Sequence, residues 1–327
     1  GTTCGVMAAM CALASEGEKV VIAGDCHESV CRGLALSGAE PLYISPYYDE
    51  RESLAGGIDP EELRRLLSGG ANVRAVFLTH PSYYGTYSDL ERIAGIAHGF
   101  GVPVAADEAH GAQAAFADTG IKPALACGAD VAVQSTHKML GSMTQTSMLH
   151  MSGSMVDRSR MRNFVSMLQT TSPSYPLMAS LDSTRALMED EGERIWKEVI
   201  SLTDSARDEI DGIPGLRCVR DFEQSPGVRR TLERARLVID PSGLGITGTR
   251  LEELLRREHG VWLEFADDLH AVALPGSGSV KEDFGRLLQG LRTISGACSG
   301  SAAGSGSHGV KNEEKAKAWS VEVRRHV

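Results

Sequence analysis

A lysine and an aspartate follow two short apolar runs of the sequence, and both could take part in chemistry. Lys138 comes shortly after the run 131–133, and Asp107 directly follows the run 102–106. Short apolar runs with polar boundaries predict buried strands, and open α/β sheets bind ligands beyond the carboxyl ends of their strands. Desolvation at such a place lowers the pKa of a lysine and frees its amine for imine chemistry. On this stretch alone, a solvated structural lysine is an equally good interpretation.

The combination of a lysine with a carboxylate at a nearby strand end indicates pyridoxal 5′-phosphate (PLP). The aldehyde of PLP needs a lysine for covalent attachment, and its pyridine nitrogen needs a carboxylate partner. Its phosphate needs hydroxyls and backbone N–H groups, which a helix N-terminus supplies. The first residues, GTTCGVMAAMCALA, predict a loop that leads into such a helix, although they lack the pattern of a P-loop.

Several motifs, in order along the chain, resemble those of the Orn/Lys/Arg decarboxylases, which are PLP enzymes of the aspartate-aminotransferase fold type (fold type I). The motifs are GDCHESVCRGLALSGAEPLYI, PSYYG, DEAHGA and STHKML. The likeness runs from about residue 1 to about 292 and is stronger up to about 184. The resemblance implies decarboxylation of arginine, lysine or ornithine to CO₂ and a polyamine precursor. It also implies a homodimer or higher homo-oligomer, because this fold places its site at a subunit interface.

The resemblance also implies roles for individual residues. Lys138 would hold PLP, Asp107 would keep the pyridine nitrogen protonated, and His27 would stack on the ring. Either His27 or the freed Lys138 would return a proton to the substrate carbon. The other implied contacts are Thr2, Thr3, Cys4, Ser135 and His137 for the phosphate, His110 near the ring hydroxyl, and Ser82, Tyr83 and Tyr84 beside the substrate.

The elements that must position these residues alternate along the first half of the chain. Strands are expected at 19–23, 40–44, 75–79, 102–106 and 131–133, with helices between them, and later at 145–151. This alternation predicts a doubly wound, mainly parallel sheet. Because His27, the loop 79–85, Asp107 and Lys138 all follow predicted strand ends, they should meet at one edge of that sheet.

The pattern changes in the second half of the chain. Helix is expected at 156–168, and one or two long helices then lead to strands near 216–220, 235–239, 261–265 and 271–274 and helices near 247–258 and 280–293. These predict a smaller α/β domain on a partly antiparallel sheet. The expected division is a PLP-binding large domain (1–185), a connecting helix (186–212), a small domain (213–294) and a disordered tail (295–327). Because the chain begins inside a motif and without methionine, the front of the large domain is expected to be missing.

Composition limits the class of protein. The 327 residues are 42% hydrophobic and 23% charged, and no apolar stretch has the length of a transmembrane helix. A net charge of -10 argues against a nucleic-acid surface and is compatible with a cationic substrate. Seven cysteines without a C-x-x-C pair predict reduced thiols in the cytoplasm.

Other interpretations of these residues are weaker or remain as alternatives. DEAH also occurs in one group of helicases, but those proteins need an upstream P-loop, which is absent here. The acidic and histidine residues at 107–110 and 137 match no zinc spacing, so no metal site is expected. A Ser/His/Asp hydrolase would need a G-x-S-x-G turn, which the sequence lacks. The alternatives to a decarboxylase are an aminotransferase, aldolase or desulfurase of the same fold, or a non-catalytic, truncated PLP-fold protein.

Overall fold

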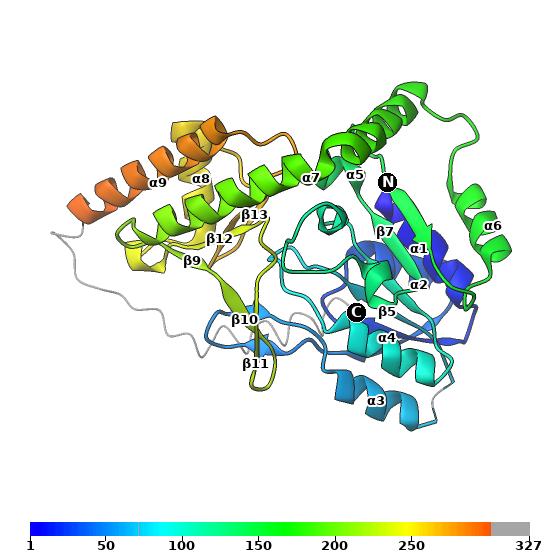
Figure 1. The fold of residues 1–327 in the computed structure, drawn as a ribbon. Coiled ribbons are helices and arrows are strands. Elements are labelled where there is room, and N and C mark those ends of the chain that lie inside the picture. The colour runs from blue at the N-terminus through cyan, green and yellow to red at the C-terminus, as the bar shows by residue number, and fades with distance from the viewer. Residues whose placement is uncertain (71, 302–327) are drawn as a thin grey trace.

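The computed structural model describes residues 1–70 and 72–301, and a six-stranded sheet forms its centre (Figure 1). The strand order is β2 (Glu40–Ile44), β1 (Lys19–Ala23), β5 (Val73–Thr79), β6 (Val104–Asp107), β7 (Val131–Gln134) and β8 (Met148–Met151). The first five strands are parallel, and β8 pairs antiparallel with β7. The predicted α/β fold with a mainly parallel sheet is confirmed.

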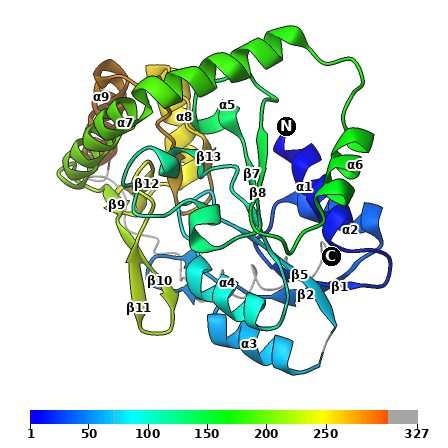
Figure 2. The ribbon, with the colours of Figure 1, turned by 45° about the vertical axis from the view of Figure 1, so that its right-hand side comes forward.

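Helices cover both faces of this sheet (Figure 2). On one face lie α3 (Pro60–Ser68) and α4 (Leu90–Gly99), and on the other lie α1 (Thr2–Leu13), α2 (Glu28–Ser37) and α6 (Arg158–Leu168). Neighbouring strand residues therefore enter different cores, as Val21 and Ile22 do. A sheet buried on both sides needs apolar residues at nearly every position, which explains the unbroken apolar runs in the sequence.

A single helix, α7 (Tyr175–Asp211), leads from the central sheet to a second, smaller sheet (Figure 1). The smaller sheet has the order β13 (Phe265–Ala266), β14 (Ala271–Ala273), β12 (Leu237–Asp240) and β9 (Arg217–Val219), with antiparallel pairing throughout. With α7, the helices α8 (Gly248–His259) and α9 (Lys281–Ser301) enclose its core. The domain boundaries at 185, 212 and 294 remain predictions.

Short elements complete the chain. They are α5 (Thr136–Met139), the strands β3 (Tyr48–Asp49) and β4 (Leu54–Ala55), and 3₁₀ helices at Ala112–Ala115, Ala124–Cys127 and Ser242–Leu244. None of the helices described for residues 1–301 has both the length and the apolar character needed to cross a membrane.

Several details differ from the sequence-based expectations, among them that the strand expected at 145–151 covers only Met148–Met151. The hairpin of β10 (Asp221–Ser225) and β11 (Val228–Thr231) was not predicted; a distant carboxylate, Asp49, accepts a hydrogen bond from the backbone of β10 at 2.7 Å. The strand expected at 261–265 is confined to Phe265–Ala266. A disordered tail was expected from residue 295, but α9 continues to Ser301, and Ile294 and Cys298 pack on the smaller core; the rest of the expected tail, 302–327, lies outside the described part.

Candidate active site

A cavity of about 290 Å³ lies at the carboxyl ends of the parallel strands, where the topology places ligand sites. Its volume is at the lower end of the range for small-molecule sites. The lining residues are Gly1, Thr2, Thr3, His27, Thr79, Pro81, Tyr83, Asp107, Ala109, His110, His137, Lys138, Thr144 and Gln145. The sheet thus brings together most of the site residues predicted from sequence.

Lys138 lies on α5, directly after β7, and its amine points to His110. Nζ is 2.8 Å from Nε2 of His110 and 5.4 Å from the ring centroid of Tyr83. Burial lowers the pKa of Lys138, while the carboxylates of Glu264 and Asp107 act in the opposite direction. The amine is therefore closer to its neutral, nucleophilic form than a lysine in water.

His110 forms the wall that faces this lysine. Burial, reinforced by the charges of Arg236 and Lys138, lowers the pKa of His110 to about 2. The ring is therefore neutral at physiological pH, and its Nε2 accepts the hydrogen bond from Lys138. Within the described part of the chain, the buried Nδ1 has no hydrogen-bond partner. The ring of Tyr83 packs against this histidine with a centroid distance of 4.6 Å.

Asp107 ends β6 and places a buried carboxylate in the cavity. Its Oδ1 accepts a hydrogen bond from the N–H of Ala109 at 3.1 Å. Burial raises the pKa of Asp107, and this hydrogen bond and the charges of His27 and Lys138 lower it. Because a buried charge needs a close partner, a protonated group on a ligand would complete this environment.

His27 stands at the N-terminus of α2, where it caps the helix. Its Nδ1 accepts a hydrogen bond from the N–H of Ser29 at 3.1 Å. Because Nδ1 accepts this bond, the ring proton is carried by the other nitrogen, Nε2. This cap fixes a histidine that lines the cavity.

Hydroxyls and helix N–H groups gather at one end of the cavity. Thr2 and Thr3 lie in the first turn of α1, which has no side-chain cap, so its first N–H groups are available to an anion. The hydroxyl of Thr2 is 2.9 Å from that of Ser135, and His137 donates from Nδ1 to the carbonyl of Thr146 at 2.7 Å. The N–H of Cys4 instead bonds to the carbonyl of Gly1.

Two of the predicted substrate-contacting residues are engaged elsewhere. The hydroxyl of Ser82 is 2.7 Å from that of Thr86, and the hydroxyl of Tyr84 donates to Asp267. Thr79 ends β5 and lines the cavity; the loop 79–85 was expected at this sheet edge, but Thr79 itself was not singled out as a site residue. Its buried hydroxyl has no hydrogen-bond partner in the described part of the chain.

Glu108 follows Asp107 but has its own buried partners. Its two oxygens accept hydrogen bonds from the N–H of Ala124 and the side chain of Gln134, each at 2.7 Å. Burial raises the pKa of Glu108 from 4.5 to about 7. Between these values the folded chain retains a proton that the unfolded chain releases, so stability contributed by this group falls as pH rises.

In the wild type, Glu108 should therefore lower the free energy of unfolding by about 3 kcal/mol as the pH rises from 4.5 to 7. Glu108→Gln should lack this decrease. Urea denaturation of both proteins across this range measures the difference. The exposed carboxylate Glu91 offers the control Glu91→Gln, whose curve should follow that of the wild type. Parallel curves for the wild type and Glu108→Gln would contradict the prediction.

The residues around the cavity fit PLP. An amine with a lowered pKa, a buried carboxylate and an uncapped helix N-terminus correspond to its aldehyde, ring nitrogen and phosphate. The buried hydroxyl of Thr79 and the Nδ1 of His110 are polar atoms that a ligand could satisfy.

The fold is that of the type I PLP-dependent enzymes, as two crystal structures illustrate. A lysine decarboxylase of Francisella novicida matches with a TM-score of 0.78 at 20% identity, over 90% of this chain and 47% of that one. A ureidoglycine-glyoxylate aminotransferase of Bacillus subtilis matches with a TM-score of 0.71 at 14% identity, over 99% and 83%.

The sequence places the chain more narrowly. The family model described as Orn/Lys/Arg decarboxylase, major domain, matches residues 1–229, and the chain belongs to this family. An arginine decarboxylase of Bacillus subtilis (strain 168) is 33% identical over 294 residues, which are 90% of this chain and 60% of that protein. A lysine decarboxylase of Pseudomonas aeruginosa is 28% identical over 52% of this chain and 25% of its own length. The chain thus spans about 60% of the length of the Bacillus relative.

Proposed function

We propose that the protein binds PLP and decarboxylates a basic amino acid, either arginine, lysine or ornithine. The observation that carries the proposal is the convergence of Lys138, Asp107 and His27 on one cavity, in a chain of this family. Bound PLP supplies an electron sink for the carbon that loses CO₂. The named activities of the Bacillus and Pseudomonas relatives support the substrate class.

Each residue of the site would have a separate role in binding the cofactor or moving a proton. Lys138 would hold the cofactor through Nζ, and burial favours the neutral amine that attachment requires. Asp107 would keep a proton on the ring nitrogen. His27 would lie against the ring, and its Nε2 or the released Nζ of Lys138 would deliver a proton to the substrate carbon. Thr2, Thr3, Ser135 and His137 would hold the phosphate.

CO₂ release tests the reaction type. The purified protein with PLP should release CO₂ from at least one of the three basic amino acids, with formation of the matching amine. Release of CO₂ separates a decarboxylase from an aminotransferase, which would instead leave a keto acid. A protein that binds PLP and releases no CO₂ from any of the three would contradict the proposed reaction.

The hydroxyl of Thr2 provides a test of the phosphate end. Thr2→Val keeps the shape of the side chain and removes the hydroxyl beside Ser135, so PLP affinity should fall about tenfold. Titration of the visible absorbance of the bound cofactor measures this. Thr2→Ser retains the hydroxyl and should bind within about twofold of the wild type. Unchanged affinity in Thr2→Val, or an equal loss in both variants, would contradict a phosphate contact of this hydroxyl.

We also propose that the chain acts as a homodimer or higher homo-oligomer in the cytoplasm. Large apolar side chains are exposed at the end of α6 and at the start of α7, including Met167 (76% exposed) and Tyr175 (78% exposed). Exposed large apolar side chains favour a surface that is covered in an assembly, and a second copy of the chain is the proposed cover. The scattered cysteines of the sequence favour a reducing compartment.

A further inference from the structure

A buried ion pair joins Glu233 and Arg236, outside the residues that line the cavity. Both side chains are 0% exposed, and they lie in the segment between β11 and β12, where the chain returns to the smaller sheet. Burial of two charges carries a desolvation cost that their attraction offsets only with good geometry and further hydrogen bonds. The further hydrogen bonds of this pair lead to the cavity.

Arg236 contacts two residues of the cavity wall. Its Nε donates to the carbonyl of Tyr83 at 3.1 Å, and Nη2 donates to the carbonyl of His110 at 3.1 Å. Gln113 closes the network, because its Nε2 donates to the carbonyl of His110 at 2.9 Å and to Glu233 at 3.1 Å. The guanidinium of Arg236 thus fixes the backbone of Tyr83 and His110, the two residues whose rings face the amine of Lys138.

The loop that carries Tyr83 packs directly on the ion pair. The N–H of Glu233 donates to the carbonyl of Gly85 at 3.0 Å. Gly85 has φ +86°, and a Cβ at this position would lie 2.8 Å from Cδ of Arg236. The loop therefore approaches the pair with no room for a side chain, and a shift of Arg236 would be passed on to Tyr83.

We propose that Glu233 and Arg236 are positioning residues, which hold the wall formed by Tyr83 and His110 against Lys138 and so tie the smaller sheet to the cofactor site. The inference deepens the proposed function and rests on it. An arginine suits this role because its planar fork donates in several fixed directions, whereas a lysine is a flexible point charge. The charge of Arg236 also helps to keep His110 in the neutral state that accepts from Lys138.

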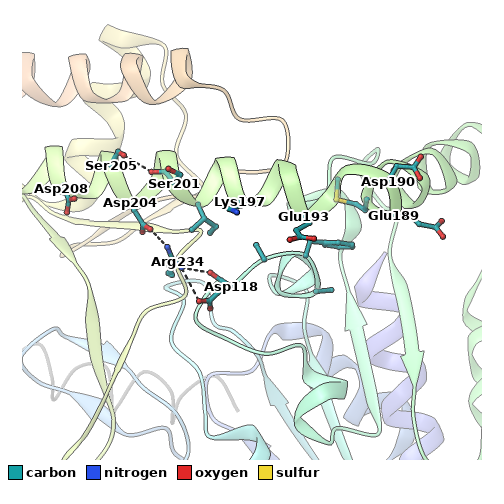
Figure 3. Close-up of a pocket in the computed structure, with 15 residues that line it drawn as sticks. Asp118, Glu189, Asp190, Glu193, Lys197, Ser201, Asp204, Ser205, Asp208 and Arg234 are labelled. Atoms are coloured by element: carbon teal, nitrogen blue, oxygen red, sulfur yellow. Dashed lines mark hydrogen bonds and ion pairs between the residues drawn. The ribbon is translucent and has the colours of Figure 1, made fainter.

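Arg234 provides a matched control two residues away. It pairs with Asp204 of α7 at 2.5 Å and donates to the carbonyl of Asp118 at 2.9 Å. Figure 3 shows Arg234 between these two residues. It lines a different, larger groove below α7 and does not line the cavity of Lys138. Its substitution by lysine thus disturbs the guanidinium bonds of an arginine in the same segment without freeing the wall.

The test compares the wild type, Arg236→Lys and Arg234→Lys by hydrogen exchange of segments 82–86 and 109–113 without cofactor, and by PLP titration. For Arg236→Lys we expect exchange in both segments to accelerate about tenfold and PLP affinity to fall about tenfold, because two hydrogen bonds from a charged donor are lost. Arg234→Lys should stay within about twofold. Exchange and affinity in Arg236→Lys equal to those of Arg234→Lys would overturn the proposal.

The outcomes separate this proposal from the proposed function. If the wild type binds no PLP, the proposed function fails, and the exchange comparison still decides whether the pair holds the wall. If Arg236→Lys does not fold, Gln113→Leu replaces it, since this variant keeps both charges of the ion pair and loses the hydrogen bonds that link the carbonyl of His110 to Glu233. Faster exchange at 109–113 in Gln113→Leu supports the proposal, and unchanged exchange overturns it.

Discussion

Lys138→Ala should abolish covalent attachment of PLP and lower kcat/KM for decarboxylation by at least about 10⁴-fold. No other lysine lines the cavity in the described part of the chain, so no second amine could replace Lys138. His110, the hydrogen-bond partner of Lys138, is held in its neutral form. The visible absorbance of the protein with PLP and the rate of CO₂ release measure the two effects. The fold should persist, because alanine leaves an apolar surface where a desolvated amine stood.

Two further variants serve as controls for Lys138→Ala. Lys138→Arg keeps a cation beside His110 but has no amine of suitable reactivity, so attachment should again be lost. Lys122→Ala removes an exposed lysine that pairs with Glu91 at 3.1 Å, and its activity should remain within about twofold of the wild type. Persistence of the lysine-bound absorbance in Lys138→Ala would rule out the proposed role of this residue.

Asp107→Asn should lower kcat by about 10²–10³-fold while the protein still binds PLP. Asparagine keeps the acceptor that Ala109 uses but cannot hold a proton on the ring nitrogen by charge. Since burial penalises the carboxylate of Asp107, the cofactor-free variant should be at least as stable as the wild type. Steady-state kinetics and urea denaturation without PLP measure the two quantities.

Asp130 is a buried aspartate with a structural role and serves as the control. Its Oδ2 accepts from the N–H of Val104 at 2.8 Å and from Nε2 of His98 at 2.9 Å. Asp130→Asn should therefore lose about 1–2 kcal/mol of stability and keep its kcat. If Asp107→Asn instead lost stability and retained kcat, Asp107 would be a structural residue like Asp130.

The site was largely predictable because it lies on the most regular part of the fold. The runs 102–106 and 131–133 indicated strands, and parallel strands place their carboxyl ends at one edge. This alone explains why Asp107, Lys138 and His27 line one cavity. Their catalytic roles remain predictions.

Contacts across long sequence separations could not be predicted in this way. Arg236 reaches Tyr83 and His110 from more than a hundred residues away, and its sequence neighbourhood resembles that of any charged surface segment. The directions of Ser82 and Tyr84 depend on their loop, since adjacent residues there face different partners. The extension of α9 was hidden by a composition rich in small residues, because packing of its last turns on the smaller core outweighs propensity.

The most direct test of the account is to locate the cofactor. The protein is incubated with PLP, reduced with borohydride to make the attachment permanent, digested, and mapped by mass spectrometry. A pyridoxyl group is expected on the peptide that contains Lys138 and on no other lysine at comparable yield. Label on another lysine such as Lys122, or no label on Lys138, would contradict it.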